Sequence, residues 1–190
     1  MSNITVTTNA DSGAGSLREA IAQAQPGDTI QFDSSLANQT ITLTSGGFAI
    51  SNNLTIDGAG APGLTISGNN AVRIFGVDQS GTNFTLKNVT LADAFLPNDF
   101  GGAIHTVPNV TLTVENCQFN NNVSGGGGAI FIRDHSTLTV TNSKFDGNDG
   151  ATFGDQVFSG GAIGSLEKCN ITITGSEFTD NKGINGGAIY

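Results

Sequence analysis

Short segments in which apolar residues alternate with threonine recur along the chain. They begin at Leu54, Leu64, Phe84, Leu112, Leu138 and Ile171. A period of two, built from β-branched and aromatic residues, is typical of strands with one buried face. The pattern therefore predicts a succession of short strands.

The position four residues after the start of each segment is always glycine or asparagine. These residues are Gly58, Gly68, Asn88, Asn116, Asn142 and Gly175. Glycine and asparagine tolerate a left-handed backbone better than other residues. We therefore predict a left-handed bend at each of these positions, as expected when strands repeat in parallel coils.

A longer repeat sets the length of each coil. Gly-Gly-Ala-Ile begins at residues 101, 127, 160 and 186, and Phe-x-x-Asn follows the first three copies after a constant interval of 18 residues. The seven extra residues of the one long spacing all lie between Asn148 and Gly160. A constant block with one variable loop is typical of stacked coils. The sequence therefore predicts an all-β protein, a right-handed single-stranded parallel β-helix.

Stacking the coils in register would bring equivalent side chains together. The first residue of each Phe-x-x-Asn motif and its upstream equivalent would form one core stack, namely Leu91, Phe119, Phe145 and Phe178. The isoleucines of the longer repeat, Ile104, Ile130, Ile163 and Ile189, would form a second stack. The threonines would form a ladder on the outer face.

One segment, residues 16–24, predicts a helix. Leu17, Ala20, Ile21 and Ala24 fall on one face, and Ser16 with Glu19 matches a capping box. Because an open coil exposes unpaired backbone, such a helix is suited to cover the N-terminal end. We expect one structural domain, with the strand and capping helix in residues 1–28 and the coils in residues 29–190.

Composition excludes several classes of function. The chain has 7 basic and 16 acidic residues in 190, a net charge of −9, which disfavours nucleic acid as a partner. No apolar run is long enough to span a membrane, and the N-terminus does not have the pattern of a signal peptide. Cys117 and Cys169 are interpreted as small packing residues.

The N-terminal segment resembles a bacterial protein family. Asp11-Ser-Gly-Ala-Gly followed by Ser16-Leu-Arg-Glu-Ala-Ile resembles the start of secreted β-helix proteins of cyanobacterial type that carry an LREAI motif. The Gly-Gly-Ala-Ile and Phe-x-x-Asn repeats resemble those of chlamydial polymorphic outer-membrane proteins. These resemblances imply a pectate-lyase-like solenoid, export to the cell surface or the extracellular space, and a role in adhesion or matrix building.

Candidate catalytic groups are few. Asp99 and His105 flank the first Gly-Gly-Ala-Ile, and Arg133-Asp134-His135 follows the second. Polysaccharide-cleaving β-helix enzymes need several carboxylates on one face of a groove, and these residues match no such motif. The sequence therefore predicts no catalytic residue. The second group is also consistent with a solvated turn that contains an ion pair.

Two sets of residues are candidate binding sites. Asp146, Asn148, Asp149 and Asp155 place oxygen ligands for a possible calcium ion close together, although a solvated acidic loop is the preferred explanation. His105, Phe131 and Tyr190 each follow a Gly-Gly-Ala-Ile and would form an outward aromatic column able to stack on sugar rings. The alternative for Phe131 is that a loop covers it.

The threonine ladder suggests a third surface. Regular threonine arrays can match ice or a crystalline polymer, but threonine is also common in strands for packing reasons alone. Lys87 and Glu115 are predicted to interrupt the ladder.

The sequence as a whole favours a non-enzymatic structural module of an exported surface protein. The alternatives are a carbohydrate-binding or carbohydrate-cleaving protein and, more remotely, an ice-binding protein. The chain stops five residues into a repeat, so we expect a fragment or a C-terminal end that stacks on another chain.

Overall fold

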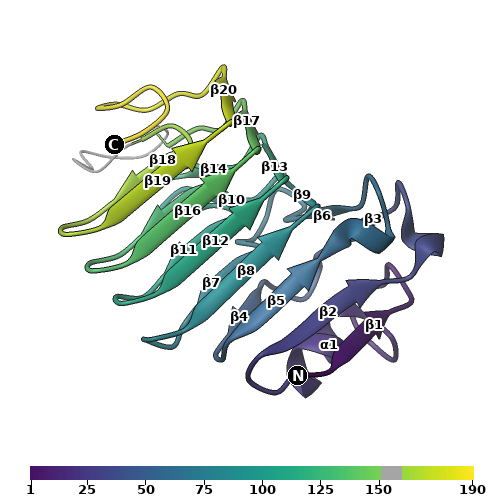
Figure 1. Cartoon of the computed structure of the whole chain (residues 1–190). Coiled ribbons are helices and arrows are strands. Elements are labelled where there is room, and N and C mark those ends of the chain that lie inside the picture. Colours follow the sequence, from purple (N-terminus) through teal and green to yellow (C-terminus); the bar gives the residue numbers. More distant parts are fainter. Residues whose placement is uncertain (151–159) are drawn as a thin grey trace.

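The computed structural model describes residues 1–150 and 160–190, and it confirms the predicted parallel β-helix. The chain winds into coils, and equivalent strands of neighbouring coils pair in parallel (Figure 1). The coils stack from the N-terminal end to the C-terminal end, so each coil contacts mainly the one before and the one after it.

Three sheets form the walls within the described residues. The first sheet contains β1 (Asn3–Val6), β2 (Asp28–Phe32), β5 (Leu54–Asp57), β8 (Asn83–Lys87), β12 (Thr111–Glu115), β16 (Thr137–Thr141) and β19 (Asn170–Thr174). The second contains β3 (Thr40–Thr42), β6 (Thr65–Ser67), β9 (Thr90–Ala92), β13 (Gln118–Asn120), β17 (Lys144–Asp146) and β20 (Glu177–Thr179). The third contains β4 (Phe48–Ile50), β7 (Phe75–Val77), β11 (Ile104–Thr106), β15 (Ile130–Ile132) and β18 (Ile163–Ser165).

Shorter elements join these walls. Strands β10 (Phe95–Leu96) and β14 (Val123–Ser124) pair with each other. Two single-turn 3-10 helices, η1 (Ser34–Leu36) and η2 (Gly58–Gly60), replace the sharp bend of later coils in the N-terminal part of the chain.

The core consists of side-chain columns that run through successive coils. The predicted stack of Leu91, Phe119, Phe145 and Phe178 is confirmed, and Ile41 and Ile66 extend it toward the N-terminus. The rings of Phe119, Phe145 and Phe178 lie face to face, with centroids 4.6 and 4.7 Å apart. The isoleucine column is confirmed too, and Phe48 and Phe75 continue it.

The predicted left-handed bends are correct in the later coils and wrong in two earlier ones. Asn88, Asn116, Asn142 and Gly175 have φ between 48° and 61°. Gly58 instead begins η2, and glycine is needed there because a Cβ atom would lie 2.3 Å from the carbonyl oxygen of Asn88. Gly68 is also not left-handed, because the bend falls on Asn69 and Asn70, which have φ of 57° and 52°.

The error at Gly68 comes from strand assignment. The prediction treats the segment that starts at Leu64 as equivalent to the one that starts at Phe84, but its strand β6 belongs to the second sheet, where Ile66 pairs with Leu91. The turn after Ile66 therefore lies at a different corner of the coil from the turn after Leu86. The local alternation of the two segments is the same, so the pattern alone does not separate them.

The paired glycines of the longer repeat have a steric explanation. A Cβ atom on Gly102 would lie 2.4 Å from the carbonyl oxygen of Gly128, and one on Gly128 would lie 2.4 Å from that of Gly161. Each coil therefore rests on the next through bare backbone at this corner, and any larger residue would push the coils apart.

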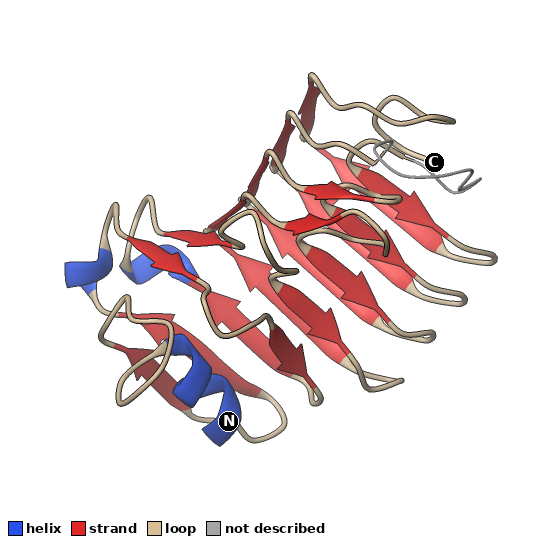
Figure 2. Cartoon of the chain, turned by 180° about the vertical axis from the view of Figure 1, so that it is seen from behind, coloured by secondary structure: helices blue, strands red, loops and turns tan. Residues whose placement is uncertain are grey.

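The predicted helix covers the N-terminal end of the β-helix. Helix α1 (Leu17–Gln23) lies against the first coils (Figure 2), and Leu17 and Ala20 are buried. Ser16 is the N-cap and accepts a hydrogen bond from the Glu19 amide at 3.2 Å. The capping box is modified, because the Glu19 carboxylate accepts from the amide of Gly15, 2.6 Å away, instead of that of Ser16.

Candidate functional site

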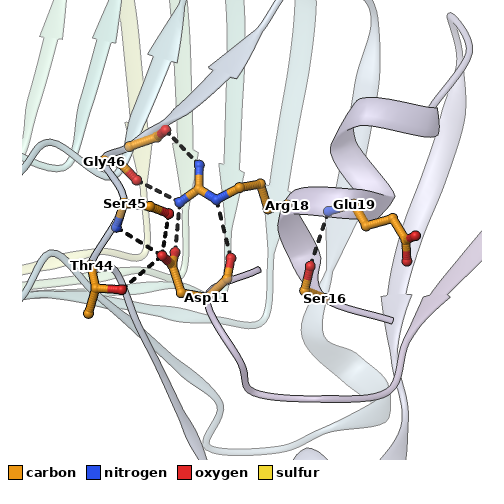
Figure 3. A network of polar contacts seen from close by, with 8 residues as sticks. Asp11, Ser16, Arg18, Glu19, Thr44, Ser45 and Gly46 are labelled. Atoms are coloured by element: carbon orange, nitrogen blue, oxygen red, sulfur yellow. Dashed lines mark hydrogen bonds and ion pairs between the residues drawn. The ribbon is translucent and has the colours of Figure 1, made fainter. Parts of the chain in front are cut away.

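The residues before and within α1 hold the helix to the coil beside it. The Arg18 guanidinium forms an ion pair with Asp11 at 2.7 Å and donates to the carbonyl oxygens of Gly46 and Gly47 at 2.7 and 3.1 Å (Figure 3). Asp11 also accepts from the Thr44 hydroxyl and from the amide and hydroxyl of Ser45. The Arg18 guanidinium lies 4.7 Å from the centroid of the Phe48 ring. The Leu-Arg-Glu motif thus has a structural role.

This network makes the attachment of the helix sensitive to acid. Burial opposes ionisation of Asp11, but hydrogen bonds from Ser45, Arg18 and Thr44 outweigh it and hold its pKa well below the ordinary value. A depressed carboxylate pKa contributes stability above the unfolded-state pKa of about 3.9 and loses it as the pH falls further. We expect the free energy of unfolding to fall below about pH 4, and to fall less in an Asp11→Asn variant. Urea unfolding between pH 7 and pH 2.5 measures both slopes, and equal slopes would contradict the assignment.

A ladder of buried asparagines explains the Phe-x-x-Asn motif. The Nδ2 group of Asn148 donates to Oδ1 of Asn181 and to the Phe119 carbonyl, both at 2.9 Å. Its Oδ1 accepts from Nδ2 and from the backbone amide of Asn122, at 2.9 and 3.1 Å. The sequence showed the motif, but only the stacking of coils reveals that these side chains bond to each other.

The ladder changes the interpretation of the acidic loop. Asn148 was a candidate calcium ligand, but its side chain is fully buried and its amide is committed to the ladder. Asp146 accepts a hydrogen bond from the Thr179 hydroxyl, and Asp149 lies 3.5 Å from the Lys182 ammonium. The fourth candidate, Asp155, lies outside the described residues. Within residues 1–150 and 160–190, no three His, Cys, Asp or Glu side chains gather as metal ligands.

The aromatic column on the third sheet is covered at Phe131 and exposed at Tyr190. Phe131 is fully buried, because the segment between β10 and β11 places the Phe100 ring on it with centroids 4.4 Å apart. His105 is beside Phe131 in register, and their ring centroids are 6.1 Å apart. Gly164 separates Phe131 from Tyr190, which is 46% exposed. The alternative that a loop covers Phe131 is therefore correct.

Arg73 binds the segment that covers Phe131, which we call the 97–103 strap. Its guanidinium donates to the Asp99 carboxylate and to the Phe100 carbonyl, both at 2.8 Å, and to the Gly101 carbonyl at 3.1 Å. Burial opposes ionisation of Asp99, but its contacts with Arg73 and Phe100 hold the pKa of its carboxyl below the ordinary value. The 97–103 strap is thus held in place by the Arg73–Asp99 ion pair and by the stacking of Phe100 on Phe131.

His105 lies beside Phe131 as a neutral imidazole. Burial lowers its pKa to about 4, and the Arg73 charge acts in the same direction. Its Nε2 atom is buried without a hydrogen-bond partner in the described part of the chain. Asp99 and His105 are the first candidate catalytic group, and each has a structural role. Asp99 pairs with Arg73 and holds the 97–103 strap, whereas His105 packs beside Phe131.

The remaining candidates have structural positions. His135 occupies a left-handed turn with φ of 61° and is exposed, which fits the solvated-turn interpretation of Arg133-Asp134-His135. Cys117 is buried in a column with Ser143, whose hydroxyl accepts from the Cys117 amide at 3.1 Å, and burial raises the pKa of its thiol to about 11. Cys169 is half-buried, and its Sγ lies 3.2 Å from the Arg133 carbonyl oxygen.

The threonine ladder is more regular than the sequence indicated. Lys87 and Glu115 form a 2.8 Å ion pair and interrupt the column that ends with Thr141 and Thr174, as predicted, but the adjacent column is free of interruptions. The uninterrupted column on the outer face of the first sheet consists of Thr29, Thr55, Thr85, Thr113, Thr139 and Thr172. Binding to ice or a crystalline polymer stays a prediction.

Two pockets that sequence reasoning missed lie on the outer face of the third sheet. One, of about 340 Å³, lies among Phe48, Ala49, Arg73, Gly76, Asp78 and Leu96. The other, of about 270 Å³, lies between α1 and β4 and has Phe48 and Ala49 in common with the first. Ala49 and Gly76 stand in the column that His105 and Phe131 fill in the next two coils, and the Asp78 carboxylate lies over Gly76, with Oδ1 2.9 Å from where a Cβ atom would be.

The two ends of the β-helix differ. At the N-terminal end, α1 covers the core, whereas the C-terminal coil leaves core columns open. Ile163 is fully buried, but the next member of its column, Ile189, is 40% exposed. Ile171, Ile173 and Phe178 are only half-buried, although their equivalents one coil earlier are fully buried.

Comparison of the sequence with known protein families, and with functionally characterised proteins, finds no match. Among the described residues, no helix is long and apolar enough to cross a membrane.

Proposed function

We propose that the chain is a non-enzymatic structural module of an exported surface protein, and that its open coil stacks on a further β-helical coil to build a rigid stalk or filament. The observation that carries this proposal is the uncovered C-terminal coil. Its core columns stand in register with those of the coil below, so an added coil would continue them without rearrangement.

Two forces favour such stacking. The outer edges of β18, β19 and β20 are the last in their sheets within the described residues, and an edge strand presents unpaired backbone groups to another chain. Burial of Ile171, Ile173, Phe178 and Ile189 would add apolar contact along the same surface. Each added coil would lengthen the rod by about 4.7–4.9 Å.

The proposed location rests on resemblance. The segment from Ser16 to Ile21 and the glycine-rich repeats resemble exported bacterial β-helix proteins and chlamydial polymorphic outer-membrane proteins. A surface or extracellular role in adhesion or matrix building follows from that resemblance. The internal use of Arg18, Arg73 and Asn148 supports a scaffold, because these polar side chains hold coils together.

The test is the association of purified residues 1–190. Sedimentation velocity over a range of concentrations should show dimers or longer end-to-end species, and electron microscopy should show rods longer than one chain. Ile173→Lys places a charge on the open surface, where an uncompensated charge in an apolar contact is costly, and should abolish association. Thr174→Lys is the matched control, because Thr174 is the adjacent exposed residue of β19 on the outer face.

Circular dichroism checks that both variants keep the strand content of the parent. A monomeric parent at all concentrations would contradict stacking between copies. Equal loss of association in the Thr174→Lys control would contradict the assignment of the open coil as the contact.

A further inference from the structure

The N-terminal end of the stack of coils presents no open core. Helix α1 packs against β1 and β4 at this end (Figure 2), and its Leu17 side chain is fully buried. Arg18 holds the helix in place through the carbonyl oxygens of Gly46 and Gly47. The core columns therefore end on α1, and a coil of another copy cannot continue them from this side.

The open coil at the other end has an apolar surface. Apart from Met1, the large apolar side chains that are exposed in the described part of the chain are Ile184, Ile189 and Tyr190, and all three lie in this coil. Exposed apolar side chains gathered in one place are typical of a contact surface.

The charges of this end permit contact between two copies of it. Residues 160–190 contain two basic and three acidic side chains, a formal charge of −1, whereas the whole chain carries −9. These side chains are Lys168, Lys182, Glu167, Glu177 and Asp180. Most of the negative charge therefore lies outside the surface that two open coils would share, so charge repulsion between them is small.

The edge strand of the open coil, β19, is self-complementary about its central residue, Thr172. The amide of Asn170 and the carbonyl oxygen of Thr174 bond to the preceding coil. Because successive residues of a strand direct their backbone groups to opposite sides, the amides and carbonyls of Ile171 and Ile173 are directed to the open edge. In an antiparallel pair centred on Thr172, Ile171 of each copy would exchange two hydrogen bonds with Ile173 of the other.

The same symmetry keeps the core continuous. A two-fold axis through Thr172 and normal to the first sheet leaves inward side chains inward, so Ile171 and Ile173 of both copies face one shared core. The axis also brings the second wall of one copy onto the third wall of the other. The Phe178 column of each copy would then meet the Ile189 column of its partner, and both columns are incompletely covered in the open coil.

We infer that the partner of the open coil is the open coil of a second copy, joined to it by a two-fold axis through antiparallel β19 strands. This inference rests on the proposed function, because it names the partner of the same surface. A contact of this kind uses the same patch on both copies and therefore closes on itself. Stacking ends at a dimer, a rod of twice the length of one chain with α1 at both of its outer ends.

The experiment is disulfide cross-linking of a Thr172→Cys variant, made in a Cys169→Ser background, with copper–phenanthroline as the oxidant. Cys117, the other native cysteine, is buried. The inferred axis places the two residue-172 Cα atoms about 4.5 Å apart, as in a non-hydrogen-bonded antiparallel pair, which is within the range of a disulfide. Most of the variant should convert to a covalent dimer, and addition of Ile173→Lys should prevent this.

Thr139→Cys in the same background is the matched control, because Thr139 is in the same outer column one coil earlier. In the inferred dimer the two residue-139 Cα atoms are three strand spacings apart, about 14 Å, which is too far for a disulfide. This variant should form no covalent dimer. Equal cross-linking of Thr139→Cys and Thr172→Cys would overturn the inferred axis.

Head-to-tail stacking would instead place Thr172 beside Asn3, which begins the same outer column. A mixture of Thr172→Cys and ¹⁵N-labelled Asn3→Cys chains should therefore give no mixed covalent dimer by mass spectrometry. Sedimentation velocity of the parent should fit a monomer–dimer equilibrium. A mixed dimer, or species larger than a dimer, would overturn this inference and leave the proposed stacking intact, whereas a parent that stays monomeric would overturn both.

Discussion

Replacement of Phe145 by alanine is expected to lower the free energy of unfolding by about 3–5 kcal/mol. The Phe145 side chain is fully buried, and its ring lies between Phe119 and Phe178 with centroids 4.6 and 4.7 Å away and nearly parallel planes. Truncation therefore removes two ring stacks and leaves a cavity that rigid neighbouring coils cannot close. Urea denaturation followed by far-ultraviolet circular dichroism measures the change.

The matched control is Phe178→Ala in the open coil. Phe178 stacks on Phe145 alone among the rings described and is only half-buried, so its truncation should cost clearly less. Equal losses at the two positions would show that the column does not stabilise the fold through burial. If Phe145→Ala lowered the free energy of unfolding much less than Phe178→Ala, the placement of Phe145 in an inner coil and Phe178 in the open coil would be contradicted.

The sequence predicted the fold because the determinants of a β-helix are local and repeat. The alternation around Leu112 and Leu138, the asparagine bends and the fixed interval to Phe119 each encode one part of a coil. Because these signals recur at constant intervals, they also predict which residues of successive coils stack on one another. The same signals misled at Gly68, because two corners of the coil share one local pattern, and at Gly58, because the 3-10 helix η2 replaces the bend at that corner.

The candidate sites were harder to predict because they depend on what covers a residue. Alternation correctly places Phe131 opposite to the inward Ile130, but the ring that buries it comes from the strap, 31 residues earlier in the chain. One of the two pockets on the third sheet lies beside Ala49 and Gly76, whose contribution is the lack of a large side chain. Neither fact has a sequence pattern, because each is a property of packing between distant segments.

The Asn148 ladder links the same repeat to stability and shows why the calcium interpretation failed. An asparagine beside two aspartates in a glycine-rich segment has the composition of a metal loop. Its position three residues after a core phenylalanine instead turns its side chain into the interior. There the coil corner leaves the backbone amide of Asn122 outside the strand ladder, and Oδ1 of Asn148 accepts its hydrogen bond, while Nδ2 of Asn148 donates to the Phe119 carbonyl.

Replacement of Asn148 by alanine is therefore expected to lower the free energy of unfolding by about 2–6 kcal/mol, since it orphans at least two buried polar groups at about 1–3 kcal/mol each. The backbone amide of Asn122 and one Nδ2 hydrogen of Asn122 both lose their acceptor, Oδ1 of Asn148. Hydrogen exchange should show the loss locally, as faster exchange of the Asn122 amide. Asn83→Ala is the matched control, because Asn83 is exposed on the outer face of β8, and it should unfold like the parent.

A stability loss for Asn148→Ala no larger than that of the control would mean that the ladder adds nothing beyond what water supplies to the same groups. The ladder would also be contradicted if, above pH 5, the Asn148→Asp variant had the same free energy of unfolding as the parent. The carboxylate could accept from Asn122, but it has no donor for the Phe119 carbonyl or for Oδ1 of Asn181. The ladder requires that Asn148 both donate and accept, so only an amide side chain, placed at the same depth as Asn122 and Asn181, passes the hydrogen bonds from one of these coils to the next.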